Sequence, residues 1–128
     1  MDTNVLLRAA VRDDPQQAIS AAHALRTADL IAVPVAALCE FVWGMRSAYK
    51  KSSQDVARSI RSLVSSPNVV TNHPVIEAGL AVLDKGGDFA DGAIAYEGEW
   101  LGAEEFVSFD EKAVKLLKAR GKRARLLV

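Results

Sequence analysis

The sequence is poor in cysteine, in histidine and in net charge. Its 128 residues include one cysteine, Cys39, and two histidines, and sixteen Lys and Arg balance sixteen Asp and Glu. A single cysteine cannot form an internal disulfide, and no Cys-x-x-Cys or His-rich spacing occurs, which excludes a disulfide scaffold and a Cys/His zinc site. A chain without net charge is not expected to coat nucleic acid through bulk electrostatics, although local basic patches can still contact it.

Long hydrophobic runs and targeting signals are also missing. The most apolar stretch, 30–45, is interrupted by Pro34 and Glu40 and is shorter than the roughly twenty residues that span a membrane. The first residues, Met-Asp-Thr-Asn, have neither the positive charge nor the apolar run of a secretory signal. We therefore expect a cytoplasmic protein that does not bind membranes. Hydrophobic residues make up 50% of the chain, which is enough for a single domain over 1–128.

Short apolar runs alternate with longer segments of helical spacing. The runs predicted as strands are 30–33, 69–71, 106–109 and 126–128, and the segments predicted as helices are 15–28, 35–49, 53–64, 74–85, 89–101 and 111–119. Strands that alternate with helices pair in parallel through helical crossovers. The predicted fold is therefore α/β, with three α/β/α layers around a central, mostly parallel sheet.

Four acidic residues lie near the expected strand ends, where ligands bind in α/β folds. Asp2 opens the chain, Glu40 lies a few residues past 30–33, Asp91 is in the first turn of the 89–101 helix, and Asp110 directly follows 106–109. Most of them also have a structural explanation. Asp110 and Asp88 are good helix N-caps, Asp91 is favourable near a helix start, and Asp2 needs no role as an exposed terminal acid.

Glu40 is the hardest of these acids to explain by structure alone. It is the only charged residue from Val35 to Met45, in a helix whose other residues are apolar or small, and such a helix is normally buried on all sides. A buried carboxylate is costly unless a cation or hydrogen-bond donors meet it. The neutralising group would be either an arginine from elsewhere in the chain or a bound cation.

Carboxylates gathered at one edge of a sheet raise one another's pKa, and a hard divalent cation removes that conflict. Mg²⁺ and Mn²⁺ prefer carboxylate oxygens, and Mg²⁺ usually keeps positions open for a substrate phosphate. A set of carboxylates without a catalytic His, Ser or Cys is typical of metal-dependent phosphodiester hydrolysis.

Four segments resemble the acidic motifs of PIN domains, most closely those of the VapC-type toxins of bacterial type II toxin–antitoxin pairs. They are DTNVLLR at 2–8, LCEFVW at 38–43, DFADGAIA at 88–95 and VSFD at 107–110. The resemblance covers essentially the whole chain in the right order. It implies a compact PIN-like fold, an endoribonuclease that depends on Mg²⁺ or Mn²⁺, inhibition by a cognate VapB-like antitoxin, and frequently a homodimer.

The same resemblance assigns roles to individual residues. The catalytic and metal-binding acids would be Asp2, Glu40, Asp91 and Asp110, and the residues that support them would be Thr3, Asn4, Asp88 and Ser108. The sequence departs from the family at two positions. Only Met1 precedes Asp2, where the family has its first strand, so either the recorded start is too late or that strand is shortened. Gly92 stands where Ala is frequent, a change expected to soften the start of its helix.

Basic and aromatic residues each allow two interpretations. Cations concentrate in two groups, the first Arg46, Lys50 and Lys51, the second Lys112, Lys115, Lys118, Arg120, Lys122, Arg123 and Arg125. They form either a surface for the RNA backbone or solvated helix faces with favourable charges at helix ends. Trp43 and Trp100 are expected to pack in the core or at an interface rather than to stack on bases.

The pair of helices between Val35 and Val64 offers a surface for a partner. Its exposed apolar residues would form a groove for an antitoxin helix or a homodimer face, and an antitoxin arginine would be attracted into the acidic pocket. The alternative function is that of a catalytically weak PIN-like module, which acts as an RNA-binding or partner-binding subunit.

Overall fold

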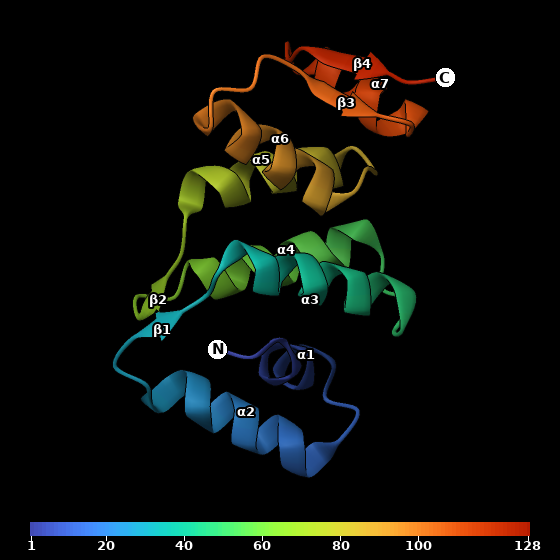
Figure 1. The fold of residues 1–128 in the computed structure, drawn as a ribbon. Helices are drawn as coiled ribbons and strands as arrows, with labels where there is room; N and C mark the ends of the chain where they lie inside the picture. Colours follow the sequence, from blue (N-terminus) through green and yellow to red (C-terminus); the bar gives the residue numbers. More distant parts are fainter. The chain divides into compact units, whose positions relative to one another are not determined.

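The computed structural model describes all residues from Met1 to Val128 as seven helices and four short strands (Figure 1). They are α1 (Thr3–Val11), α2 (Pro15–Thr27), β1 (Ile31–Ala32), α3 (Val35–Ser47), α4 (Ser53–Val64), β2 (Val69–Val70), α5 (His73–Asp84), α6 (Phe89–Trp100), β3 (Phe106–Ser108), α7 (Glu111–Ala119) and β4 (Ala124–Leu126). The chain divides into two compact units, Met1–Asn72 and His73–Val128. The single domain expected over 1–128 stays a prediction.

The first unit consists of α1 to α4 and one small parallel sheet. Ile31 of β1 pairs with Val69 of β2, and Ala32 pairs with Val70. Helix α2 begins where the sequence predicts, because Asp14 accepts a hydrogen bond from the backbone N–H of Gln17 and Pro15 is the first helical residue. Helices α1 and α3 pack against each other, and both contribute to the core of this unit.

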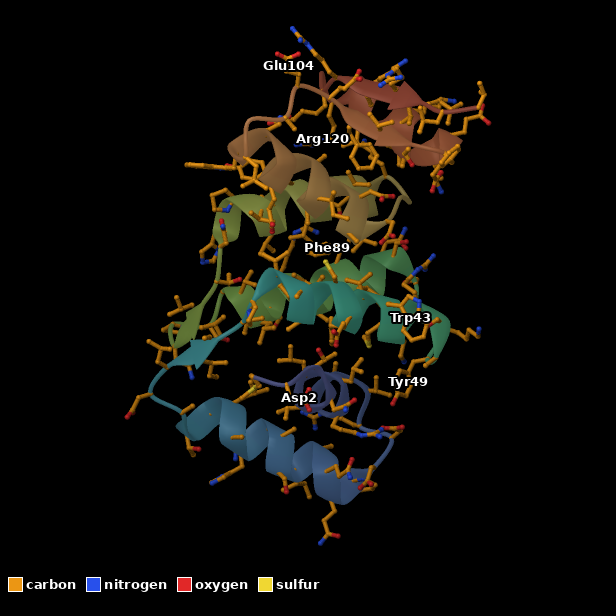
Figure 2. The ribbon with its side chains drawn as sticks, in the orientation of Figure 1. Asp2, Trp43, Tyr49, Phe89, Glu104 and Arg120 are labelled. Atoms are coloured by element: carbon orange, nitrogen blue, oxygen red, sulfur yellow. The ribbon has the colours of Figure 1, made fainter.

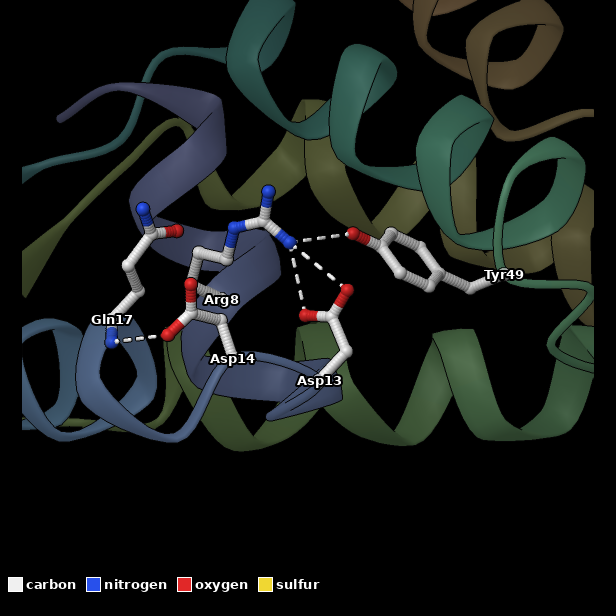
Figure 3. A network of polar contacts seen from close by, with 5 residues as sticks. All are labelled: Arg8, Asp13, Asp14, Gln17 and Tyr49. Carbon is white, nitrogen blue, oxygen red and sulfur yellow. Dashed lines mark hydrogen bonds and ion pairs between the residues drawn. The ribbon is translucent and has the colours of Figure 1, made fainter.

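A polar contact ties the end of α1 to the end of α3 (Figure 3). One guanidinium nitrogen of Arg8, Nη1, donates to both carboxylate oxygens of Asp13 at 2.9 and 3.0 Å and to the hydroxyl of Tyr49 at 3.0 Å. The hydrogen bond and charge of Asp13 raise the pKa of Arg8 further above its already high value. The guanidinium therefore fixes three segments of the first unit with one charged group.

The second unit consists of α5, α6 and α7 with a second small parallel sheet. Strand β3 pairs with β4, Phe106 opposite Ala124 and Ser108 opposite Leu126. Its core contains Val82, Val114, Leu117 and Ala124, against which Phe106 packs. Burial on one side explains why the sequence alternates apolar and charged residues along α7.

The architecture is mixed α/β, as the sequence predicts, but it is mostly helical and shows no single central sheet. Each strand is only two or three residues long, so each pairs with one neighbour inside its own unit. The six predicted helices are all present, with boundaries that shift by one or two residues. The last strand is Ala124–Leu126 rather than 126–128, because Ala124 is the residue that packs into the core.

Helix α1 was not predicted from the sequence. Its buried residues are Thr3 and Leu6, which give too short an apolar stripe to mark a helix, and the Asp2 side chain makes no capping hydrogen bond. None of the helices has the length and hydrophobicity that crossing a membrane requires.

Helices α5 and α6 pack most closely at two glycines, Gly79 and Gly92. A Cβ atom on Gly92 would clash with the carbonyl oxygen of Ala78 and would lie 2.9 Å from the Cα atom of Gly79. A Cβ on Gly79 would lie 2.6 Å from the ring of Phe89. Gly92 therefore does not merely soften the start of α6, because this close approach of two helix backbones requires it.

We expect opposite effects on stability from the same substitution at two positions of α6. Gly92→Ala should lower the free energy of unfolding by about 1–3 kcal/mol, because the added methyl group overpacks the contact with α5. Gly98→Ala should raise it by up to about 1 kcal/mol, since alanine is the better helix former and the new Cβ would meet only Ala103 Cβ at 3.7 Å. Urea unfolding followed by circular dichroism measures both. Equal stability of Gly92→Ala and the unchanged protein would contradict the packing argument.

Candidate acidic site

Two of the acids in the second unit are helix N-caps. Oδ1 of Asp88 accepts a hydrogen bond from the backbone N–H of Ala90 at 3.1 Å at the start of α6. Oδ1 of Asp110 accepts from the N–H groups of Lys112 at 3.0 Å and Ala113 at 3.2 Å at the start of α7. The structural explanation of both acids is thus confirmed. In each carboxylate only Oδ1 makes these capping bonds.

Ser108 holds the backbone that carries Asp110. Its hydroxyl oxygen accepts a hydrogen bond from the N–H of Asp110 at 2.9 Å. This contact agrees with a supporting role for Ser108, since it fixes the turn between β3 and α7.

Asp91 is the half-buried member of this group. Burial raises the pKa of its carboxyl group, and the negative charges of Asp88 and Asp110 raise it further. No salt bridge connects any of the three acids to Lys or Arg. The second unit therefore holds three neighbouring carboxylates, defined here as the acid cluster, whose mutual repulsion no cation of this unit relieves by direct pairing.

The other two predicted acids, Asp2 and Glu40, belong to the first unit. The ammonium group of Met1 donates to the carbonyl oxygen of Ala32 at 3.0 Å. Since the N–H groups of Ile31 and Val33 point to β2, the alternating residue Ala32 points to the opposite edge of β1. Met1 therefore binds the edge of β1 that does not face β2. Asp2, the next residue, is exposed at the N-terminus of α1 (Figure 2).

Thr3 contacts Glu40, whereas the sequence assigns it to the support of Asp2. The buried Thr3 hydroxyl donates to Oε2 of Glu40 at 3.1 Å and approaches the carbonyl oxygen of Ala37 at 3.4 Å. The residue after Asp2 therefore reaches the second predicted acid, and this ties the start of α1 to the middle of α3. Asn4 is exposed and lines a shallow pocket against α2 instead.

The predicted burial of Glu40 is wrong. Helix α3 buries Leu38, Phe41, Val42 and Met45 on one side, whereas Glu40 lies on a solvent-exposed side together with Ala36 and Trp43. The prediction treated every apolar residue of α3 as buried, whereas alanine and tryptophan can occupy exposed helix positions. An exposed carboxylate needs no neutralising partner, so burial no longer argues for a cation at Glu40. One oxygen of its carboxylate accepts the hydrogen bond from Thr3.

The donor chemistry fits a hard cation only in part. Neither unit brings together three or more His, Cys, Asp or Glu side chains in a group that could hold a metal ion. Mg²⁺ commonly uses just one or two carboxylates and keeps several water ligands, which Asp91 and Asp110 can supply. Two of the four predicted acids lie in each unit, and their joint action on one ion stays a prediction.

Some of the cations near the C-terminus form salt bridges and others do not. Lys122 forms a salt bridge with Glu99 at 3.3 Å, and Arg125 forms one with Glu105 at 2.9 Å. Lys112 has no such partner, and its Nζ atom lies 3.5 Å from the position of a Cβ on Gly86, in the turn that leads to Asp88. Lys112 is the second residue of α7, and the sequence analysis grouped it with the other C-terminal cations without singling out this position.

Trp43 and Trp100 are not core residues, and their packing at an interface, the other place expected for them, stays a prediction. Trp43 (Figure 2) and Trp100 are 72% and 77% exposed, so neither packs in the core. Phe109, directly before Asp110, is 76% exposed, and sequence reasoning placed it simply in a strand.

A pocket of about 420 Å³ lies in the first unit between α1, α2 and α4. Its lining includes Leu6, Leu25, Phe41 and Leu63, with Arg58 at its polar side. Residues of α1, α2, α3 and α4 all line this pocket, and the groove expected on α3 and α4 for a partner stays a prediction.

No family model and no curated protein sequence matches this chain. The resemblance to PIN domains thus rests on the four acidic segments of the sequence alone.

We expect the pKa of Asp91 to fall in the variant Asp110→Asn. Asparagine caps a helix about as well as aspartate, so α7 should persist while one of the charges that raise the Asp91 pKa is lost. Nuclear magnetic resonance titration of the Asp91 carboxyl carbon measures the change. Glu104→Gln removes the same charge from an exposed loop and should leave Asp91 unaffected; an equal response in both variants would refute the proximity.

The raised pKa of Asp91 also predicts how stability depends on pH. Between the usual value of 3.8 and the raised value in the folded protein, the folded state binds more protons than the unfolded state, so stability falls as pH rises through this window. Asp91→Asn should remove that part of the fall and raise the thermal midpoint at pH 7. Thermal unfolding from pH 3 to pH 7 tests this, and parallel profiles for both proteins would argue against it.

Proposed function

We propose that the chain is a metal-dependent endoribonuclease with a PIN-like fold, the toxin of a type II, VapBC-like toxin–antitoxin pair. The observation that carries the proposal is the half-buried Asp91, which lies near two further carboxylates and has no basic partner. Unrelieved repulsion of this kind costs stability and is typical of functional sites. The order of the four acidic segments along the chain supports the same function.

Asp91 and Asp110 of the second unit would hold Mg²⁺ or Mn²⁺, and the resemblance assigns a metal-binding role to Asp2 and Glu40 of the first unit as well. The bound ion would make a water molecule more acidic for attack on an RNA phosphate and stabilise the leaving oxygen. The chain's own contribution is orientation. The hydroxyl of Thr3 holds one oxygen of Glu40, Ser108 fixes the backbone of Asp110, and Asp88 keeps the start of α6 in place.

The finer aspects of the proposal follow from the resemblance. They are a three-layer α/β/α arrangement around one sheet, a cytoplasmic location, a homodimer and a cognate VapB-like antitoxin. The apolar pocket between α1, α2 and α4 supports a partner helix, because Leu6, Leu25 and Leu63 offer apolar surface beside the charged rim at Arg58.

A second candidate is a catalytically weak PIN-like module that binds RNA or a partner without cutting. The absence of a three-ligand metal group within either unit favours it. Only the first candidate predicts hydrolysis that requires a divalent ion, whereas the second predicts binding of RNA or of a partner without hydrolysis.

We expect structured RNA to be cut in the presence of Mg²⁺ or Mn²⁺ and to remain intact in EDTA. Glu40→Gln and Asp91→Asn should each lower the rate at least about 100-fold, because each removes a charge from the proposed metal site. Gel electrophoresis of labelled RNA measures the rate. Glu77→Gln, which removes an exposed acid of α5, is the matched control. Undiminished cleavage by both site variants would point to a contaminating nuclease, and metal-independent binding without cleavage would favour the second candidate.

A further inference from the structure

Strand β3 has a hydrogen-bonded neighbour on one side only (Figure 1). The second sheet consists of β3 and β4 and has no further strand. The N–H of Phe106 donates to the carbonyl oxygen of Arg123 at 2.9 Å. The carbonyl oxygen of Ser108 accepts from the N–H of Leu127 at 2.8 Å. Because backbone groups alternate in direction along a strand, the N–H and the carbonyl of Val107 point to the opposite edge, where no strand pairs with them.

This edge lacks the usual protection against an added strand. Proteins keep other chains away from an exposed edge with lysine, proline, a bulge or a covering element. The segment from Phe106 to Phe109 contains no proline and no charged residue, and the side chains of Val107 and Phe109 are exposed. Free backbone groups beside exposed apolar side chains form a template for pairing with another strand.

A small pocket lies along the same edge. It has a volume of about 230 Å³, and its lining includes Ile94 and Gly98 of α6 together with Val107. Ile94 is exposed. Gly98 has no side chain, and a Cβ there would have only the Cβ of Ala103 near it, at 3.7 Å. The space between α6 and the edge is therefore open and apolar enough to take a side chain from a strand that lies beside β3.

The two ends of this edge differ in charge. At its start Glu105 pairs with Arg125, and the pocket lining adds one acid and one base, Glu104 and Arg123, so the charges there balance. At its end β3 leads into Asp110, which belongs to the acid cluster, and none of these carboxylates forms a salt bridge. A strand with a positive residue at the end that reaches Asp110 would complement this charge.

We propose that the free edge of β3 is a docking site for an extended segment of a partner protein, which adds a strand beside Val107. The segment carries apolar residues at alternate positions, because these share the side of the strand on which Val107 and Phe109 lie, and a lysine or arginine at the end near Asp110. Hydrogen bonds to the N–H and carbonyl of Val107 supply affinity, and the side chains supply selectivity. The inference does not depend on the proposed nuclease activity.

The test uses a fluorescein-labelled peptide of alternating valine and threonine with two lysines at one end. In one control peptide glutamates replace the lysines, and in a second a proline replaces a central threonine. Val107→Pro removes the free N–H while the bonds of Phe106 and Ser108 to β4 remain, and Val107→Thr keeps the N–H and the shape of the side chain. Fluorescence anisotropy measures affinity, and nuclear magnetic resonance measures hydrogen exchange of the Val107 N–H.

We expect the lysine peptide to bind the unchanged protein and to slow exchange of the Val107 N–H. Val107→Pro should weaken this binding by about two- to tenfold, the range that the loss of one backbone hydrogen bond gives, and Val107→Thr should weaken it less. The glutamate peptide should bind more weakly than the lysine peptide, with a difference that shrinks as salt is added. The peptide with proline should not bind.

Several results would overturn the inference. It is wrong if the lysine peptide does not bind, if exchange of the Val107 N–H is unchanged in the saturated complex, or if Val107→Pro and Val107→Thr bind the peptide equally well. If sedimentation shows a dimer that Val107→Pro dissociates, a second copy of this chain occupies the edge and the partner segment is excluded. Circular dichroism confirms that each variant is folded, and the exchange measurement needs no variant.

Discussion

The close approach of α6 to α5 at Gly92 is the constraint on which the acid cluster depends. Gly92 packs against the backbone at Ala78 and Gly79, and this contact buries the start of α6, including Phe89. Asp91 immediately precedes Gly92 and is therefore held half-buried at the edge of the same contact, where solvent cannot fully screen its charge. A bulkier residue at position 92 would push α6 away from α5 and expose Asp91, and the part of its raised pKa that burial causes would be lost.

Helix capping and a functional site are not competing explanations of the same acids here. Asp88 and Asp110 each use one oxygen to satisfy the N-terminal N–H groups of a helix, and this requirement fixes where their second oxygens are. Capping is a local, inexpensive way to orient a carboxylate rigidly. Local capping thus orients Asp88 and Asp110, whereas the packing of the second unit brings Asp110 close enough to raise the pKa of Asp91.

The sequence predicted the elements well and their assembly less well. Asp14–Pro15 and Asp110 are caps with local hydrogen bonds, so their helices could be located from residue type and order. The division into two small sheets could not, because a run such as Val69–Val70 shows that a strand forms and not with which strand it pairs. Glu40 was misjudged for a related reason. Composition indicates how apolar α3 is, but only tertiary packing decides which side of it is covered, and Glu40 is on the uncovered side.

The acids of the two units differ in the contacts that support a functional role for them. In the second unit Asp88 and Asp110 are close enough to raise the pKa of Asp91, which is an energetic relation that spacing in the sequence cannot establish. In the first unit the link between Asp2 and Glu40 is carried by a single hydrogen bond of Thr3, and both acids are exposed. Repulsion stored in the folded protein is what a bound cation would relieve. The second unit is therefore where cation binding would change the free energy most, and Asp91 is where the chemistry of this chain should be sought first.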